Sequence, residues 1–269
     1  MKIHSTAVID KKAKLADDVK VGPYAIIGPD VEIRQSTEIG PHAVITGHTT
    51  IGKNCRVSPG AYVGTPPQDL KYKGEKSYLK IGDDNIIREC VTINPGTHEE
   101  SFTSIGNNNL LMAYSHVAHD CKIGDGCVIA NVGTLAGHVT LEDKVVIGGL
   151  AGIHQFTRVG KLSIIGGCSK VVQDIPPFST CDGYPARVYG LNILGLKRSG
   201  ISAEAQRELK RAFKVLFYSG LTIKNGIEEI IRSLSLDFKE VAYLLDFLKG
   251  SERGICRGAD ENRLNRGKR

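Results

Sequence analysis

The chain has 269 residues and a formal net charge of +6 at pH 7, with 41% hydrophobic residues, 6% aromatic residues and no Trp. No stretch approaches the roughly 20 apolar residues of a membrane-spanning helix, and the first residues lack an apolar segment of signal-peptide length. Seven Cys, without CxxC spacing, argue against a disulfide framework and for reduced thiols in a cytoplasmic protein.

The excess positive charge lies in the C-terminal part of the chain. Residues 190–269 carry 16 Lys and Arg against 10 Asp and Glu, whereas residues 1–189 carry 19 of each kind. Such a distribution fits either a solvated helical surface with a tail or a docking face for an acidic partner. Nucleic acid is a poorer candidate, because no aromatic platform or binding motif accompanies the charge.

An aliphatic residue recurs every six positions from Ile3 to Val171. Of the 29 positions in this phase, 26 are Ile, Val or Leu, and Gly often follows. A period of six fits neither a helix nor a long alternating strand, but it fits short strands that turn a corner every six residues. Three such strands make an 18-residue coil whose aliphatic side chains point inward and stack on the next coil. The repeat therefore predicts a mainly β fold, a parallel β-helix over residues 1–189.

The repeat pauses twice, at about residues 65–79 (TPPQDLKYKGEKSYL) and at about residues 95–104 (PGTHEESFTS). Both stretches are polar and rich in turn-forming residues, so we expect them to leave the β-helix as protruding loops. Loops on a rigid scaffold often carry function. The second loop is interpreted as a tolerated insertion.

Beyond the repeat, the pattern becomes helical. Pro176-Pro177 and Gly183-Tyr184-Pro185 form a linker, Ser202 can cap the first predicted helix, and Gly220 can end it. The helices with one apolar face are expected at Ala203–Tyr218, Lys224–Leu234 and Asp237–Leu248. Residues 190–269 are thus predicted to form an α-helical C-terminal domain with a basic polar tail.

Histidines gather where the repeat resumes after the second loop. Addition of 18 residues to His119 gives Gly137, and a further 18 gives Gln155, so these positions stack on successive coils about 4.8 Å apart. The predicted strip along this edge comprises His116, His119, Gly137, His138, His154 and Gln155.

Three interpretations of the strip are open. The histidines can be ordinary surface residues, or they can bind zinc between coils, as in the gamma-class carbonic anhydrases. In the third, His119 is a general base, Asp120 or a nearby carbonyl orients its ring, and the Gly137 N–H receives developing negative charge. The third is favoured, because imidazole suits a hydroxyl attack on a thioester near neutral pH and neither role requires a metal.

Six motifs in order resemble the UDP-N-acetylglucosamine O-acyltransferases of lipid A biosynthesis. They are QDLKY at 68–72, SHVAHDC at 115–121, LAGHV at 135–139, IHQF at 153–156, GGCS at 166–169 and GLKR at 195–198. The resemblance runs from the first hexapeptide to about Arg257. It implies a left-handed β-helix and a homotrimer with sites between subunits. It also implies transfer of an R-3-hydroxyacyl chain from acyl carrier protein to the glucosamine 3-OH of UDP-N-acetylglucosamine.

Carried over residue by residue, the resemblance implies His119 as the general base, Asp120 as its orienter and Gly137 as the oxyanion donor. Gly167 corresponds to a position at the far end of the acyl channel, where a glycine leaves room for a longer chain. The residues expected to hold the sugar, the phosphates or the pantetheine are Gln68, Asp69, Lys71, His116, His138, His154, Gln155, Asn192 and Arg198.

The resemblance implies no metal and no cofactor bound by the protein itself, because the donor carries its phosphopantetheine on acyl carrier protein. That carrier is acidic, so the basic C-terminal surface is its expected docking face. The chain departs from the family at Ser199, where a second Arg is usual. It also has Asn94-Pro95 in place of His-Arg, which is interpreted as a loop difference without catalytic consequence.

Two rival functions use the same scaffold. The N-acyltransferase of the same pathway has an extra N-terminal domain, for which a repeat that starts at Ile3 leaves no room. The alternative from another class is a zinc-dependent hydratase of the gamma-carbonic-anhydrase type. A purely structural hexapeptide protein would leave the aligned histidines unexplained.

Overall fold

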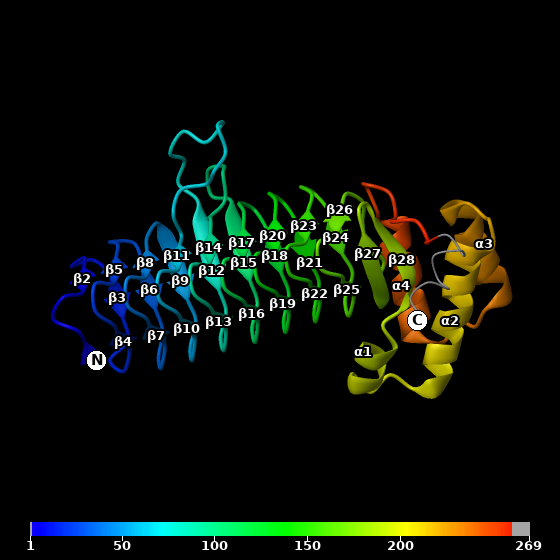
Figure 1. Cartoon of the computed structure of the whole chain (residues 1–269), viewed down its shortest axis with the longest axis horizontal. Helices are drawn as coiled ribbons and strands as arrows, with labels where there is room; N and C mark the ends of the chain where they lie inside the picture. Colours follow the sequence, from blue (N-terminus) through cyan, green and yellow to red (C-terminus); the bar gives the residue numbers. More distant parts are fainter. Residues whose placement is uncertain (1, 260–269) are drawn as a thin grey trace.

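Short parallel strands, one to each hexapeptide, build a long triangular column, which Figure 1 shows from the side. The computed structural model describes residues 2–259. Within this range the strands form three sheets, one on each face of the column. Strands of the column pair with the strand 18 residues further on, as in the register of Leu111 with Ile129, except where a loop intervenes and at the last coil, where Ile164 pairs with Thr180. The predicted 18-residue coil is therefore confirmed.

The first sheet runs the length of the column and ends in an antiparallel pair. In spatial order it contains β1 (Lys2–Ile3), β4 (Lys20–Val21), β7 (Glu38–Ile39), β10 (Arg56–Val57), β13 (Ile86–Ile87), β16 (Leu110–Leu111), β19 (Val128–Ile129), β22 (Val146–Ile147), β25 (Ile164–Ile165), β27 (Ser179–Gly183) and β28 (Ala186–Leu191).

The second and third sheets form the other two faces. The second contains β2 (Val8–Ile9), β5 (Ile26–Ile27), β8 (Val44–Ile45), β11 (Tyr62–Val63), β14 (Thr92–Ile93), β17 (His116–Val117), β20 (Thr134–Leu135), β23 (Gly152–Ile153) and β26 (Lys170–Val171). The third contains β3 (Lys14–Leu15), β6 (Glu32–Ile33), β9 (His48–Ile51), β12 (Tyr78–Ile81), β15 (Phe102–Ile105), β18 (Lys122–Ile123), β21 (Thr140–Leu141) and β24 (Arg158–Val159).

The six-residue aliphatic position fills the inside of the column. Ile45, Ile93 and Leu135 are fully buried, and such burial contributes roughly 1.5–3 kcal/mol for each side chain. In the first coil, Ile3 remains 44% exposed, because a coil stacks on only one side of it. Stability thus comes from the stacking of neighbouring coils.

Two loops leave the same edge of the column on successive coils and project from it (Figure 1). They occupy residues 64–77, between β11 and β12, and residues 94–101, between β14 and β15. Both end earlier than the sequence predicts, because β12 and β15 are four residues long and pair over their full length. The loops also hold each other: the Asn94 side-chain amide donates to the Thr65 carbonyl at 3.0 Å.

The C-terminal part closes the column with a hairpin and helices. β28 crosses the predicted border at residue 189, and neither the β27–β28 hairpin nor α1 was expected from the sequence. Ser202 caps α2, accepting from the Ala205 N–H, and α2 has the predicted bounds, whereas α3 and α4 are shifted by one or two residues. The helices are α1 (Ile193–Arg198), α2 (Ala203–Tyr218), α3 (Ile223–Ser233) and α4 (Lys239–Lys249). The predicted tail beyond residue 259 lies outside the described residues.

None of the helices within residues 2–259 combines the length and apolar character that a transmembrane segment requires.

Candidate active site

The candidate site lies on the edge of the column where the second sheet turns into the third. His119 and Asp120 form the corner between β17 and β18, and Gly137 and His138 form the corner between β20 and β21. The His138 N–H donates to the His119 carbonyl at 3.0 Å, so the two corners stack as predicted. The two loops leave this same edge on the preceding coils and therefore reach the site.

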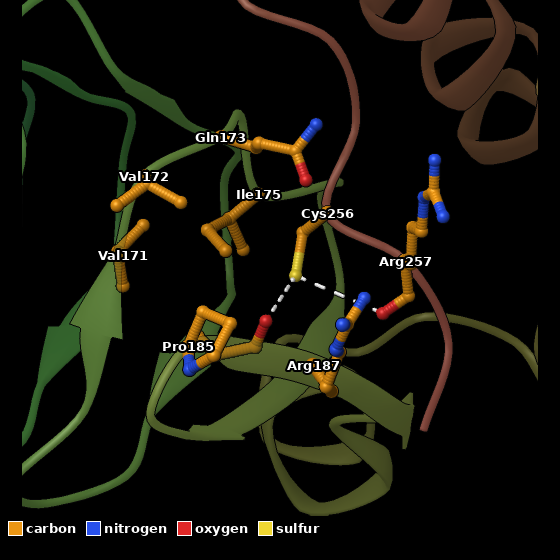
Figure 2. Close-up of a pocket in the computed structure, with 9 residues that line it drawn as sticks. Val171, Val172, Gln173, Ile175, Pro185, Arg187, Cys256 and Arg257 are labelled. Atoms are coloured by element: carbon orange, nitrogen blue, oxygen red, sulfur yellow. Dashed lines mark hydrogen bonds between the residues drawn. The ribbon is translucent and has the colours of Figure 1, made fainter. Parts of the chain in front are cut away.

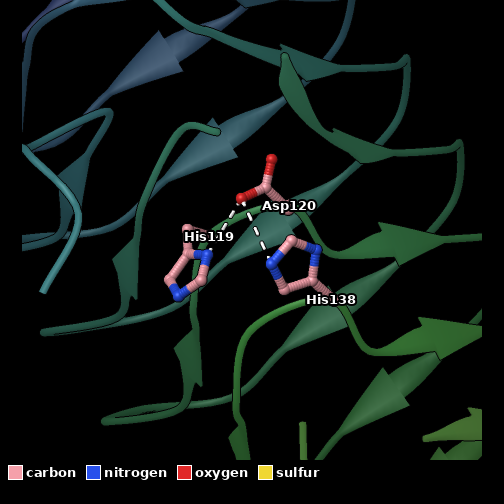
Figure 3. Close-up of side chains that lie close together, drawn as sticks. All are labelled: His119, Asp120 and His138. Atoms are coloured by element: carbon pink, nitrogen blue, oxygen red, sulfur yellow. Dashed lines mark hydrogen bonds and ion pairs between the residues drawn. The ribbon is translucent and has the colours of Figure 1, made fainter. Parts of the chain in front are cut away.

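His119 and Asp120 form a close pair that Figure 3 shows together with His138. The Nδ1 atom of His119 lies 2.9 Å from Oδ2 of Asp120, and the two side chains are only 14% and 9% exposed. Because Nδ1 is engaged, Nε2 is the nitrogen left to accept a proton. Nε2 faces Oδ2 of Asp69 from the first loop, at 3.9 Å.

The Asp120 carboxylate is stabilised as an anion. Burial alone raises the pKa of Asp120, but hydrogen bonds from the side chains of Thr97 and then His119 outweigh it and bring the pKa below its ordinary value. The Thr97 hydroxyl donates to Oδ2 at 2.7 Å, and the Thr97 N–H donates to the same oxygen at 3.2 Å. A charged Asp120 favours the tautomer of His119 that carries its proton on Nδ1.

Two further histidines of the strip are held neutral. Burial, followed by the nearby His119, lowers the pKa of His116, whose Nδ1 lies 2.6 Å from the Thr92 hydroxyl. Burial is also the main cause that lowers the pKa of His138, although the Asp120 charge opposes it. The His138 ring stacks on Phe156 of the next coil, with centroids 4.5 Å apart and ring planes 9° apart.

Gly137 is shaped by the imidazole that covers it. A Cβ at this position would meet Cε1 of His119 and would lie 2.6 Å from Nε2, so only glycine fits. Among residues 2–259, no acceptor takes the Gly137 N–H. The hydrogen bonds between coils do not use the N–H at this corner position. Equivalent positions hold proline, which has no N–H, as at Pro23, Pro41 and Pro59. The N–H of this buried residue, which packs against the imidazole, is thus free for a ligand.

The other predicted site residues are not gathered around His119 within one chain. Gln68 and Lys71 are exposed on the first loop, and Lys71 touches Asp69 only through its backbone N–H, at 2.9 Å. His154 and Gln155 are exposed on the corner two coils further on. These four remain predictions.

Three predicted residues lie elsewhere on the fold. Gly167 is exposed at the corner between β25 and β26, a different edge of the column. Arg198 is in the last turn of α1. Asn192 is buried and caps α1, because its Oδ1 accepts from the Gly195 N–H and its Nδ2 donates to the Leu162 carbonyl. The structure thus gives Asn192 a structural role that the sequence did not indicate.

Two residues at the site were missed from the sequence. Phe156 lies 18 residues after His138, so the coil period could have placed it. Thr97 lies in the second loop, outside the repeat, and no periodicity could place it against Asp120. The sequence predicts a tolerated insertion in that loop, but its contact with Asp120 shows that it helps to build the site.

A separate cavity of about 210 Å³ lies at the end of the column, between β26, the β27–β28 hairpin and the C-terminal segment (Figure 2). Cys256 lines it and donates from Sγ to the Ala186 carbonyl at 3.1 Å. None of the predicted site residues lines this cavity. The candidate site is therefore the open edge at His119.

Family comparisons agree with this fold. Residues 30–65 and 102–133 match the family described as bacterial transferase hexapeptide (six repeats). The fold and the site thus define a transferase built on a left-handed β-helix, as the sequence predicted. Residues 174–256 match the second domain of UDP-N-acetylglucosamine O-acyltransferase.

Individual relatives cover nearly the whole chain. The acyl-[acyl-carrier-protein]–UDP-N-acetylglucosamine O-acyltransferase of Thiobacillus denitrificans is 51% identical over 95% of this chain and 99% of its own length. The structure of UDP-N-acetylglucosamine O-acyltransferase from Moraxella catarrhalis is 40% identical over 96% of this chain and 100% of that one, with a TM-score of 0.90. The Francisella novicida UDP-N-acetylglucosamine acyltransferase is 41% identical over 97% and 95%, with a TM-score of 0.91. The chain belongs to the UDP-N-acetylglucosamine O-acyltransferase family, and the predicted resemblance is confirmed.

Proposed function

We propose that this chain transfers an R-3-hydroxyacyl chain from acyl carrier protein to the glucosamine 3-OH of UDP-N-acetylglucosamine, the first step of lipid A biosynthesis. The observation that carries the proposal is the His119–Asp120 pair, packed against Gly137, whose N–H has no acceptor among the described residues, in a chain of this family. The reaction would take place in the cytoplasm, where acyl carrier protein supplies the donor.

The geometry supports a general-base mechanism. Nε2 of His119 takes the proton of the sugar hydroxyl as its oxygen bonds to the thioester carbon. The Gly137 N–H receives the negative charge that develops on the carbonyl oxygen. When the C–S bond breaks, His119 returns the proton to the phosphopantetheine thiolate. Asp120 stabilises the imidazolium between these two steps, and no step draws on a metal or a further cofactor.

Asp69 is suited to hold the sugar at the base. Its Oδ2 and Nε2 of His119 are 3.9 Å apart, which is too far for a hydrogen bond between them. One hydroxyl oxygen can lie within about 2.8 Å of both atoms at this separation. Asp69 therefore supports the assignment of the first loop to sugar binding, with Gln68 and Lys71 beside it.

A homotrimer would bring the scattered residues together. Gly167 lies on a different edge of the column from His119, so one chain cannot place both against one acyl chain. Tyr114, Val132 and Leu150 occupy equivalent corners on the edge of Gly167, 41–64% exposed, and form an apolar ridge suited to burial against a second copy. A site between subunits would then draw His119 from one chain and Gly167 from its neighbour.

The basic face of α2 would dock the acidic carrier protein. Arg207 and Arg211 pair with acidic residues one helical turn away, whereas Lys210 and Lys214 are exposed. Lys197 and Arg198, at the end of α1, extend the positive charge. Long-range attraction to an acidic partner raises the association rate and weakens with salt.

A zinc hydratase is the alternative that one observation favours. His119, Asp120 and His138 are the group of possible metal ligands found within residues 2–259. The 2.9 Å separation of Nδ1 and Oδ2 is shorter than the about 3.4 Å expected between two ligands of one tetrahedral zinc ion. The pair therefore fits a hydrogen bond better than a chelate. Stoichiometric zinc in the purified protein would support the alternative.

An acyl-transfer assay tests the proposed function. Wild type and His119→Ala are compared with a panel of 3-hydroxyacyl carrier proteins and UDP-sugars. We expect the variant to lose at least about 10²–10⁴-fold in kcat, the usual contribution of general acid–base catalysis. Near-normal turnover by His119→Ala would refute the role of His119, and a wild type inactive with every donor would refute the reaction itself.

A further inference from the structure

The second loop donates hydrogen bonds to the Asp120 carboxylate, which orients the catalytic histidine. Thr97 is 5% exposed, and both its hydroxyl and its backbone N–H point to Oδ2 of Asp120, at 2.7 and 3.2 Å. The same oxygen forms a hydrogen bond with Nδ1 of His119, at 2.9 Å. A single oxygen thus joins the loop to the imidazole.

Asp120 needs such support because of its place in the fold. It occupies a coil corner with φ of +58°, so its backbone is fixed by the turn, but nothing in the repeat fixes its side chain. A free carboxylate can rotate about χ1 and χ2 and offer either oxygen to solvent or to His138, whose Nε2 lies 3.8 Å away. Two donors from Thr97 restrict this freedom, and the Ser101 side chain of the same loop also stabilises the carboxylate.

The loop that carries Thr97 is itself anchored at both ends. Gly96 donates its N–H to the Tyr78 carbonyl at 3.3 Å, and Glu100 donates its N–H to the Lys76 carbonyl at 2.8 Å. The Ser101 hydroxyl accepts from the His98 N–H at 2.9 Å, which closes the turn just after Thr97. The donors are therefore presented on a fixed backbone.

We propose that Thr97 is a positioning residue for the reaction: it holds Asp120 in the rotamer that keeps the Nδ1–H of His119 bonded and directs Nε2 toward the sugar hydroxyl. The inference rests on the proposed acyltransferase function. The hydrogen bonds of Thr97 go to Asp120 and not to the reactive Nε2 of His119, so its effect passes through Asp120. Hydrogen-bond partners that orient metal-bound histidines are typically worth 10–100-fold in activity, and we expect an effect of similar size here.

Three variants separate positioning from folding. Thr97→Val removes the hydroxyl at nearly constant shape, and Thr97→Ser restores it. Thr37→Val is the matched control, because Thr37 is also buried, donates its hydroxyl to the Gly52 carbonyl at 2.8 Å and lies several coils from the site. We expect Thr97→Val to lower kcat about tenfold or more with both KM values within threefold, whereas Thr97→Ser and Thr37→Val stay within threefold of wild type.

A double-mutant cycle tests whether Thr97 acts through Asp120. Thr97→Val is combined with Asp120→Ala. In the Asp120→Ala background, where the carboxylate is gone, we expect Thr97→Val to lower kcat by less than about twofold. A full tenfold loss in the Asp120→Ala background, or wild-type kcat in Thr97→Val, would overturn the inference. An inactive wild type would instead refute the proposed function, so the two failures are distinguishable.

Discussion

Gly137 shows how one missing side chain defines the site. The imidazole of His119 lies where a Cβ would be, so Gly137→Ala must displace the ring or the corner. We expect at least a hundredfold loss of kcat, because both the base and the oxyanion donor move. Gly152→Ala, one coil away, is the control, because its Cβ would meet no atom within 4 Å. Equal activity of the two variants in the acyl-transfer assay would contradict the tight packing of the His119 imidazole against Gly137.

The neutral histidines predict how stability depends on pH. Burial lowers the folded-state pKa of both His116 and His138 below the ordinary 6.5. The unfolded chain therefore binds more protons below about pH 6.5, and the stability that these residues contribute above that pH is lost as the pH falls through their folded pKa values. We expect the Tm to fall between pH 7.5 and pH 5.

Substitution isolates this effect. His138 faces Asp120, Asp69, His98 and His119, and His116 faces Thr92 and His119. The double variant His116→Asn, His138→Asn should show a smaller drop in Tm over that range, as followed by circular dichroism. His4→Asn, on the exposed first coil, should show the wild-type drop. Parallel pH curves for all three proteins would contradict the assignment.

At the scale of single residues, the sequence predicts contacts only where the coil period applies. The stacking of Gly137 and His138 on His119 follows from a shift of 18 residues, and the structure confirms it. Asp69 was assigned from the family resemblance alone, because a loop residue has no place in the period. The period gives no signal for Thr97 either, because its position depends on the contacts of the second loop with Lys76, Tyr78 and Asp120.

Among the elements, the coils were predictable and the closing hairpin was not. The hexapeptide pattern stops before β27, and the sequence Gly183-Tyr184-Pro185 predicts a linker where the structure has a hairpin turn. It joins two antiparallel strands because β25 leaves an open edge with which β27 pairs. This pairing requires the unpaired strand edge at the end of the assembled column, and a local sequence pattern does not predict such an edge. The amphipathic helix α2, in contrast, carries its cap and its apolar face in its own sequence.

One acidic residue of the column, Glu142, links it to α4 by a hydrogen bond, beside the apolar face that α4 buries. Glu142, in the corner between β21 and β22, accepts from Arg158 Nε at 2.9 Å, from the Lys161 N–H at 2.8 Å and from the Tyr243 hydroxyl of α4. Burial and then Glu142 raise the pKa of Tyr243, so its hydroxyl stays protonated and can donate. The Lys161 ammonium lies over the Tyr243 ring, 3.6 Å from its centroid.

Glu142→Ala should destabilise the protein by about 1–3 kcal/mol, because it leaves several half-buried donors unpaired. Tyr243→Phe should cost less, about 0.5–1.5 kcal/mol, because only one hydrogen bond is removed. Urea unfolding measures both. Glu204→Ala breaks an exposed pair with Arg207, which solvent screens, so its urea midpoint should stay close to that of wild type. A Glu142→Ala midpoint equal to that of Glu204→Ala would show that this contact does not anchor α4.

At the scale of the whole molecule, the column behaves as a one-dimensional stack. Each coil contacts its neighbours and little else, so the same register recurs along its length, as in Val21 with Ile39 and Ile147 with Ile165. This is why the fold could be predicted from one repeated residue type, although no single hexapeptide is diagnostic. Stability is then close to a sum over coils and the interfaces between them.

The stack predicts which internal deletions the protein tolerates. Removal of residues 21–38 joins Lys20 to Ile39, deletes one complete coil far from His119, and keeps every later side chain on its face. We expect this variant to fold cooperatively and to retain acyl transfer within about tenfold of wild type.

Removal of residues 21–35 takes out fewer residues but shifts the six-residue phase by three, so aliphatic side chains of the first coil face solvent and polar ones face inward. Circular dichroism melting and the transfer assay compare the two. If the variant without residues 21–35 is as stable and active as the variant without residues 21–38, the six-residue phase, and with it the stacking of aliphatic residues, does not determine the fold.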